Sequence, residues 1–271
     1  MEGSVQLKRW ITGLCLLCGI LLLLILGGSW GLLGLAVVAV TLAQWELAHL
    51  LGAATDRLRT AICMFQGACL PVAALWGGSQ GLLSALVCVL LLWMSIETLL
   101  RKELEGAGRE LGLRMFSIMY GGVLPCFFVL LWRLPQGIHW MFWTITVTAL
   151  GDTAAYYVGS IWGRKKLMPR ISPGKTVEGS LAGLAGNGAG GILYALLFLP
   201  QVVGVELLLL ALGVGLVGQL GDLSESMLKR AAQVKDSGSI LPGHGGILDR
   251  LDSLIFSAPV VFFWVNRSAT F

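Results

Sequence analysis

Residues 221–252 read GDLSESMLKRAAQVKDSGSILPGHGGILDRLD, and this charged stretch stands between two apolar runs of the chain. The flanking runs, at about 203–221 and 252–266, are predicted to be membrane-spanning helices. Charge is expensive near a lipid bilayer, so a charged segment between such helices is by default a candidate functional site. The stretch therefore indicates a polar site at the surface of a membrane protein.

The composition of the whole chain indicates the same class. Of the 271 residues, 56% are hydrophobic and 13% are charged, and the mean hydropathy is +0.82, whereas soluble domains carry about 25% charged residues. We predict an all-α integral membrane protein, a polytopic bundle of about nine transmembrane helices. The predicted spans are about 10–27, 30–51, 60–77, 80–100, 114–132, 138–160, 178–199, 203–221 and 252–266. Tight turns at Gly27-Gly28-Ser29 and Gly77-Gly78-Ser79 separate paired spans.

The basic residues predict the orientation in the membrane. With a cytoplasmic N-terminus, every Lys and Arg except Arg133 and Arg267 falls in a cytoplasmic segment, as the positive-inside rule requires. The charged stretch then faces the cytoplasm, where a soluble nucleotide would be found. We predict a multi-pass protein of the inner membrane, with residues 1–135 as a helical scaffold and residues 136–271 carrying cytoplasm-facing catalytic loops. The net charge of +4 gives no argument for a nucleic-acid partner.

Polar residues within 222–230 have the spacing of one helix face. Asp222, Glu225, Ser226 and Lys229 stand at i, i+3, i+4 and i+7, which places them on the same side of a helix. A helix end that carries carboxylates and cations together is suited to bind a metal ion and phosphate groups.

The start of the next apolar run repeats part of this pattern. Asp249, Asp252 and Ser253 stand at i, i+3 and i+4, and they follow the glycine-rich segment 242–246. Such a segment cannot continue a helix, and its glycines can bring backbone N–H groups close to an anion.

A second cytoplasmic loop, 161–178, is basic and ends in Ser172-Pro173-Gly174-Lys175-Thr176. Positive charge alone would set the topology, but a lysine at a glycine turn is also a usual phosphate binder. The segment lacks the G-x-x-x-x-G-K-[ST] pattern of a Walker A loop. Asp152 precedes it in the sixth predicted span, where an acid needs a partner, a proton or a polar cavity.

These acids are the candidates for a metal site. Mg²⁺ is usually held by one or two carboxylates together with substrate phosphates. Asp222 and Asp249 are the main predicted ligands, and Asp152, Glu225 and Asp252 are second choices. The alternative is a solvated loop whose charges only pair with one another.

Two sequence segments resemble the phosphatidate cytidylyltransferases, also called CDP-diacylglycerol synthases. The first has SMLKR at 226–230, KDSG at 235–238 and LPGHGGILDRLD at 241–252. The second has GDTAAYYVG at 151–159 and ISPGKTVEG at 171–179. The resemblance covers roughly 145–262, and earlier residues are similar only in hydrophobic layout. Val177 replaces an expected Trp and Ala154 an expected Gly, so neither departure removes a charged group.

The resemblance implies the reaction: CTP and phosphatidate give CDP-diacylglycerol and pyrophosphate, in membrane phospholipid biosynthesis. The expected partners are CTP, phosphatidate and the bilayer. Mg²⁺ is the expected cofactor, with a monovalent cation beside it as an open alternative. The candidate catalytic residues are Asp222, Asp249, Lys175, Lys229, Arg230, His244 and Arg250. The candidate substrate-binding residues are Ser172, Lys175, Thr176, Ser226, Lys229, Arg230, Lys235, His244 and Gly245.

Other interpretations stay open at this point. Another CTP-dependent lipid enzyme, such as a polyprenol kinase or an ether-lipid cytidylyltransferase, would share the multi-span layout. An ion-coupled transporter would instead need charge spread through the spans and an internal repeat. Small-xxx-small glycine pairs in span 178–199 allow close packing within one subunit or across a homodimer. Glu46 and His49, at i and i+3, have the spacing of a ligand pair but also of groups that hydrogen-bond within the bundle.

Overall fold

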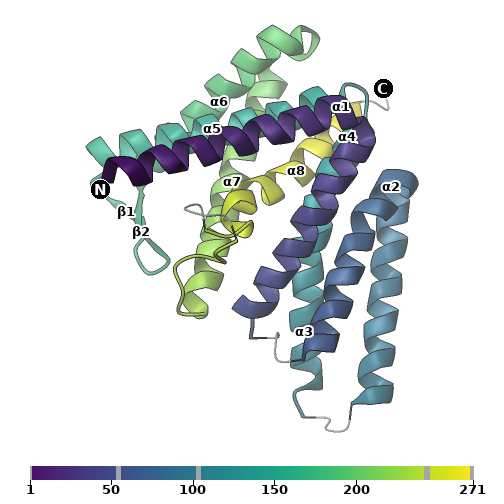
Figure 1. Ribbon diagram of the computed structural model, residues 1–271. Helices are drawn as coiled ribbons and strands as arrows, with labels where there is room; N and C mark the ends of the chain where they lie inside the picture. The colour runs from purple at the N-terminus through teal and green to yellow at the C-terminus, as the bar shows by residue number, and fades with distance from the viewer. Residues whose placement is uncertain (1, 53–55, 102–104, 241–244, 269–271) are drawn as a thin grey trace. The chain divides into compact units, whose positions relative to one another are not determined.

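The computed structural model describes residues 2–52, 56–101, 105–240 and 245–268, with side chains for residue 19 and from residue 22 to residue 267 within these ranges. The chain divides into two compact units. Unit 1 comprises Met1–Val129 and Val234–Asp249, and unit 2 comprises Leu130–Gln233 and Arg250–Phe271. The described chain is mostly helical, as predicted, with one small sheet (Figure 1).

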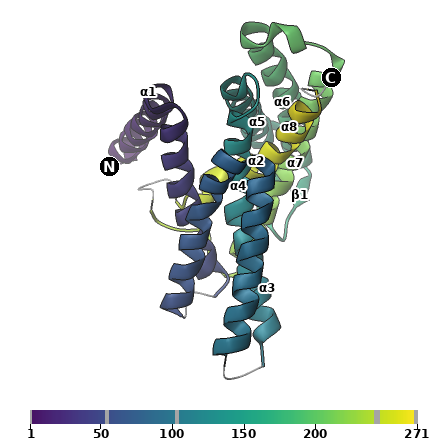
Figure 2. The same ribbon diagram turned by 90° about the vertical axis from the view of Figure 1, so that its right-hand side faces the viewer.

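Unit 1 is built on two long, bent helices, α1 (Glu2–Leu50) and α2 (Arg57–Leu100). Each bends at a glycine with positive φ, Gly28 at 52° and Gly78 at 63°, a backbone conformation that glycine adopts without strain. The two predicted glycine turns are therefore confirmed at these positions. The two arms of α2 lie side by side (Figures 1 and 2). Their shared core includes Leu70, Ala74 and Trp93, all buried.

The third part of unit 1 is a continuous helical segment with a local bulge. It runs from α3 (Ala107–Ile118) through a π-helical turn (Met119–Val123) into α4 (Leu124–Trp132), whose last three residues belong to unit 2. A Cβ on Gly121 would lie 2.7 Å from a Leu47 methyl group, and one on Gly122 would lie 2.8 Å from Leu70. These glycines therefore let the bulge pack closely against α1 and α2.

Charged side chains join α2 to α3 inside unit 1. Arg59 pairs with Asp56 at 3.1 Å, with Glu97 at 3.0 Å and with Glu110 at 3.3 Å. Arg101 pairs with the same Glu97 and Glu110 carboxylates. We call these residues the arginine–glutamate network. Residues 102–104, between α2 and α3, lie outside the described residues.

Unit 2 holds the long helices α5 (Gly137–Trp162), α6 (Val177–Phe198) and α7 (Val205–Ala231), most of α8 (Leu248–Ser268), and a 3-10 turn at Pro200–Val202. Glycines of α6 meet α5 directly, since a Cβ on Gly183 would lie 3.1 Å from the Ala155 methyl group. The buried Asn187 of α6 donates to the Val147 carbonyl of α5 at 2.8 Å. The small-residue pattern of α6 thus serves packing within one subunit.

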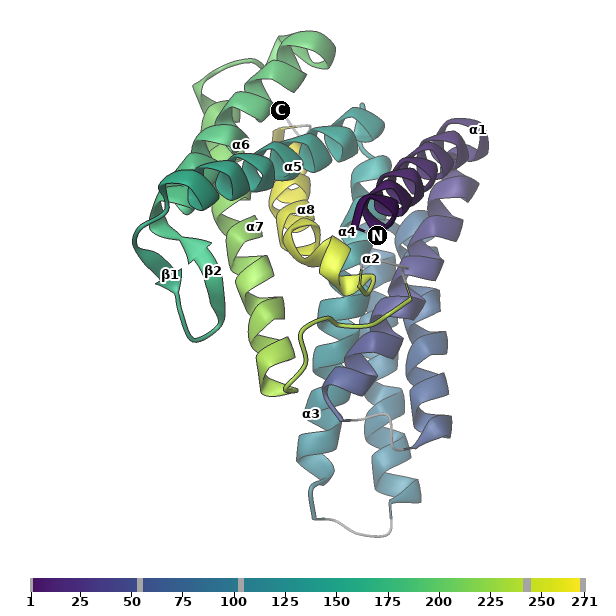
Figure 3. The ribbon, with the colours of Figure 1, turned by 60° about the vertical axis from the view of Figure 1, so that its left-hand side comes forward.

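A two-stranded antiparallel hairpin connects α5 to α6. Its strands are β1 (Lys166–Met168) and β2 (Ser172–Thr176), with Lys166 opposite Thr176 and Met168 opposite Ser172. Figure 3 shows the hairpin beside α7. The sequence did not predict these strands, because they are too short to carry an alternating pattern.

Five helical segments of the described chain are long and apolar enough to cross a membrane: Leu22–Leu50, Arg57–Leu100, Ala107–Trp132, Val177–Phe198 and Val205–Ala231. A multi-pass membrane protein is therefore supported. α5 and α8 (Leu248–Ser268) do not belong to this set, so the predicted spans 138–160 and 252–266 stay predictions. The predicted span 10–27 falls mostly on residues whose side chains lie outside the described part.

Candidate active site

The C-terminal end of α7 carries the polar face that the spacing predicted. The helix continues to Ala231, ten residues beyond the predicted span end at 221. The Ser226 hydroxyl donates to Asp222 at 3.4 Å, and Lys229 pairs with the fully buried Glu225 at 2.9 Å. The four residues therefore form two contacts one turn apart on the same face of the helix.

Lys175 joins the second predicted loop to this helix. Its ammonium group forms an ion pair with the Asp222 carboxylate, and both side chains are about 30% accessible, at 28% and 29%. The Arg230 Nε also donates to the Ile171 carbonyl at 3.3 Å. Strand β2 and the C-terminal end of α7 thus bring together two sequence segments that are separated in the chain by α6 and most of α7.

The start of α6 fixes the hairpin that carries Lys175. Thr176 is the N-cap, and its hydroxyl accepts from the Gly179 amide at 3.1 Å, as is usual for Thr at this position. Glu178 accepts from the Arg164 amide at 3.1 Å and the Lys165 amide at 3.2 Å. Thr176, predicted to bind substrate, therefore also caps α6. Ser172, the other predicted substrate-binding residue of β2 beside Lys175, is half-buried.

Two further aspartates interact electrostatically with Asp222. The charge of Asp152 in α5 interacts with those of Asp222 and Lys175. The charge of Asp252 in α8 interacts with those of Asp222, Asp152 and Lys229. We call Asp152, Asp222 and Asp252 the aspartate cluster. Three like charges in one region repel one another, which favours the binding of cations there. Lys175 and Lys229 supply part of that positive charge.

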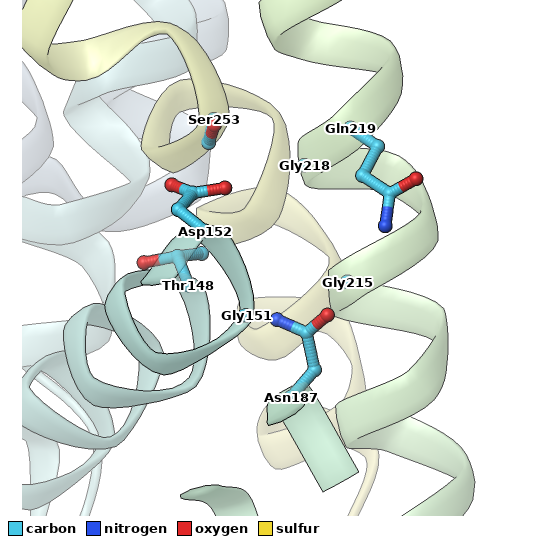
Figure 4. Close-up of a pocket in the computed structure, with 8 residues that line it drawn as sticks. All are labelled: Thr148, Gly151, Asp152, Asn187, Gly215, Gly218, Gln219 and Ser253. Carbon is cyan, nitrogen blue, oxygen red and sulfur yellow. The ribbon is translucent and has the colours of Figure 1, made fainter. Parts of the chain in front are cut away.

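A small polar pocket opens beside Asp152. Side chains from four helices line it, including Thr148, Asn187, Gln219 and Ser253 (Figure 4). Figure 4 shows Asp152 and Ser253 next to each other, and Gln219 on the neighbouring helix. The volume of about 10 Å³ is enough for roughly one water molecule. An acid in a membrane helix, which is the setting predicted for Asp152, requires a polar cavity of this kind.

In unit 1, Asp249 organises the second half of the charged stretch. Its Oδ2 accepts from the Ser237 amide at 2.9 Å and the Gly246 amide at 2.8 Å, and the Ser237 hydroxyl lies 3.0 Å from it. Asp249 lies in the first turn of α8, where a carboxylate interacts favourably with the helix dipole. One oxygen of this predicted metal ligand is therefore occupied by the protein's own donors.

Glu46 of α1 also contacts the charged stretch, although it was not among the predicted site residues. Its carboxylate is fully buried and accepts from the Ile247 amide at 2.8 Å, the Leu248 amide at 3.0 Å and the Ser237 hydroxyl at 2.9 Å. The interpretation of Glu46 as a group that hydrogen-bonds within the bundle is confirmed. His49 contacts Trp45 of its own helix, both through the carbonyl at 2.7 Å and through the rings, whose centroids lie 4.4 Å apart.

The remaining predicted residues lie as follows. Lys235 and Arg250 are exposed, and Gly245 has a positive φ of 78°. His244 lies outside the described residues. The roles predicted for these residues stay predictions.

The donor chemistry of the aspartate cluster fits Mg²⁺. In the described part of the chain, no three His, Cys, Asp or Glu side chains are grouped closely enough to hold a metal ion by themselves. Mg²⁺, however, ordinarily takes one or two carboxylates and fills its other positions with waters and substrate phosphates. Asp222 with Asp152 or Asp252 supplies a donor set of that kind.

Several known proteins are similar to this chain. The chain is 42% identical over 155 residues to a phosphatidate cytidylyltransferase of Bacillus subtilis, a match that covers 57% of this chain and 58% of that protein. The same enzyme name belongs to relatives from Synechocystis, 40% identical over 184 residues (58% of this chain, 62% of that protein), and from Staphylococcus saprophyticus, 42% identical over 154 residues (54% and 56%).

The matched regions thus span less than two thirds of these relatives. A model of the cytidylyltransferase family, in contrast, matches residues 7–267. Because that match extends over nearly the whole sequence, the chain belongs to the cytidylyltransferase family.

Proposed function

We propose that this protein transfers a cytidylyl group from CTP to phosphatidate, giving CDP-diacylglycerol and pyrophosphate. The observation that carries the proposal is the Lys175–Asp222 ion pair, which joins the two sequence motifs at one place in unit 2. The relatives named phosphatidate cytidylyltransferase support the same substrate pair. The apolar helices support a bilayer setting for the lipid substrate.

The reaction needs charge control more than acid–base chemistry. The phosphate of phosphatidate is already an anion near neutral pH, and one of its oxygens would attack the α-phosphorus of CTP. The bond from that phosphorus to the bridging oxygen of the β-phosphate would break, and pyrophosphate would leave with the electron pair. The main barrier is the repulsion between two polyanions, which positioned cations offset.

In this scheme the residues of unit 2 divide the work. Lys175 and Lys229 would contact phosphate oxygens, and Arg230 holds the hairpin that carries Lys175. Asp222, with Asp152 or Asp252, would hold Mg²⁺ on substrate phosphates, and Asp249 would be a further ligand through the oxygen that does not face Ser237. With Mg²⁺ bound, the negative charge on the departing pyrophosphate would be neutralised.

The proposal includes the setting of the enzyme. We place the site at the cytoplasmic face of the inner membrane, in a bundle of about nine spans, because nearly all basic residues fall in the segments on one side. A homodimer that packs through the glycines of α6 is kept as an alternative, because these glycines already pack within one subunit.

Purified full-length protein in detergent would test the function. Pyrophosphate release would be measured with phosphatidate, a polyprenol or an ether-lipid phosphate, each given CTP, dCTP or ATP, with Mg²⁺ or with a chelator. We expect Mg²⁺-dependent release with a cytidine nucleotide, and only when phosphatidate is present. Activity on another lipid would overturn the substrate, and no release from folded protein with any lipid would overturn the enzyme reading.

A further inference from the structure

We propose that Glu46 is a positioning residue for the reaction, acting through Asp249 and the start of α8. This inference rests on the proposed function, although its structural part can be tested alone. The residues concerned are Glu46, Ser237, Gly238, Gly246, Ile247, Leu248 and Asp249, which we call the Glu46 cradle. All of them belong to unit 1.

The first reason is where the backbone donors at the start of α8 are satisfied. The first N–H groups of a helix have no partner inside it. The Leu248 amide at the helix start and the Ile247 amide before it both donate to Glu46, one to each carboxylate oxygen. A side chain about 200 residues earlier, at sequence separations of 201 and 202, thus provides the cap that a neighbouring Ser or Asp usually provides.

The second reason is the close fit of two glycines around this carboxylate. A Cβ on Gly238 would lie 2.6 Å from Glu46 Oε1, and one on Gly246 would lie 2.5 Å from both carboxylate oxygens. Real Cβ atoms do not approach oxygen so closely, so any other residue would displace Glu46 or the loop. The glycines of the charged stretch therefore do approach an anion, and this anion is the protein's own Glu46.

The third reason is the link from Glu46 to Asp249. The Ser237 hydroxyl lies 2.9 Å from Glu46 Oε2 and 3.0 Å from Asp249 Oδ2. A hydroxyl carries a single proton, so Ser237 can donate to only one of these oxygens at a time. The Ser237 and Gly246 amides donate to the same Asp249 oxygen. A displacement of Glu46 would therefore change the position of the Ser237 hydroxyl, which helps to orient Asp249.

Glu46 itself is a poor candidate for contact with substrate. Its side chain is fully buried, and its oxygens face the three donors of the cradle. A buried carboxylate is stable only when charge-assisted hydrogen bonds compensate for lost water. Both oxygens of Glu46 therefore accept from donors of the protein, which agrees with a positioning role and not with a metal ligand or a base.

The test is Glu46→Gln, with Gln44→Met as the matched control. The amide of Gln would direct an N–H at one of the cradle donors whichever way it turned. Gln44 lies on the same helix, is also buried, and hydrogen-bonds Ser117 of α3 at 2.7 and 3.1 Å, away from the cradle. Hydrogen exchange at residues 237 and 246–248, kcat, and the Mg²⁺ concentration for half-maximal activity would be measured for both variants in the full chain.

For Glu46→Gln we expect faster exchange at these amides, at least a tenfold lower kcat and a higher Mg²⁺ requirement. For Gln44→Met we expect a lower thermal midpoint with wild-type kcat and Mg²⁺ requirement. Unchanged kcat and Mg²⁺ requirement in Glu46→Gln would overturn the proposal, as would the same losses in Gln44→Met. If wild-type protein is inactive, the proposed function fails, while the exchange data still decide whether Glu46 holds the loop.

Ser237→Ala serves as the second variant if Glu46→Gln does not fold. It removes only the hydroxyl that links the two carboxylates. We expect the same changes at smaller size, and a Glu46→Gln/Ser237→Ala double variant that is less impaired than the two single effects combined, since both act through one network. Wild-type kinetics in Ser237→Ala would overturn the link between Glu46 and Asp249.

Discussion

The carboxylates of unit 1 and those of unit 2 differ in what surrounds them. In unit 1, Glu46 and Asp249 accept from backbone amides and the Ser237 hydroxyl, while Glu97 and Glu110 pair with arginines. In unit 2, Asp222 meets Lys175 at a partly accessible position, and Asp152 faces a polar pocket. The acids of unit 1 accept hydrogen bonds or form ion pairs with donors of the protein. The three aspartates of the aspartate cluster instead repel one another.

This difference distinguishes acids that stabilise the fold from acids that are suited to bind ligands. An acid whose oxygens are occupied by fixed donors holds a fold in place, and removing it leaves buried donors without partners. Acids that repel one another, next to lysines, raise the affinity for cations and anionic ligands together. Sequence alone gives both kinds of residue the same appearance, since each is an acid in or near an apolar helix.

Asp222→Asn should have the largest effect and would test the unit 2 half of the comparison. Loss of a metal-holding carboxylate removes several kcal/mol of transition-state stabilisation, which corresponds to roughly a 100- to 1,000-fold lower kcat. Pyrophosphate release would measure this loss, and gel filtration in detergent would check the fold. Glu110→Gln, which removes an acid of the arginine–glutamate network, is the matched control and should keep wild-type kcat. Equal losses in both variants would erase the proposed difference.

Lys175→Gln should have an intermediate effect, mainly on substrate binding. A charge-assisted contact to phosphate is worth about 1.5–3 kcal/mol, so the KM for CTP should rise roughly 10- to 100-fold. Initial rates over a range of CTP concentrations would show the change. Lys166→Gln, in the same hairpin but on its exposed edge, is the control and should leave KM close to wild type. A normal KM in Lys175→Gln would mean that Lys175 only neutralises Asp222.

Arg59→Ala should have the smallest effect on activity and would sharpen the unit 1 half. It leaves the buried Glu97 with fewer donors, although Arg101 remains, so the free energy of unfolding should fall by about 1–3 kcal/mol. Thermal unfolding followed by detergent gel filtration would measure the loss. The kcat of the remaining folded protein should stay near wild type, and a large drop in kcat at unchanged stability would count against a supporting role for this network.

Local signals in the sequence account for much of the helical fold. The polar face from Asp222 to Lys229 and the glycine turns at Gly28 and Gly78 were predictable, since spacing and backbone freedom depend only on nearby residues. The hairpin at 166–176 was not predictable, because its strands contain three and five residues. α5 and α8 are not among the helices of the described chain that are long and apolar enough to cross a membrane, so their crossing also stays a prediction.

The candidate site divides in the same way. The motifs pointed to Lys175 and Asp222, and the structure brings them into contact. The role of Glu46 could not be derived, because its partners lie about 200 residues later and no local pattern encodes such a contact. The signal that was available is a buried acid in an apolar helix together with the glycines at 238 and 246, which leave room for it.

The most direct test of the central claim follows the phosphorus atoms of CTP. Purified protein would be given phosphatidate, Mg²⁺ and CTP labelled either at the α- or at the γ-phosphate, and the label in the lipid phase would be counted. Cytidylyl transfer predicts that the α-label enters the lipid and the γ-label stays in soluble pyrophosphate. A γ-label in the lipid would mean phosphoryl transfer, as in a lipid kinase, and would contradict the account.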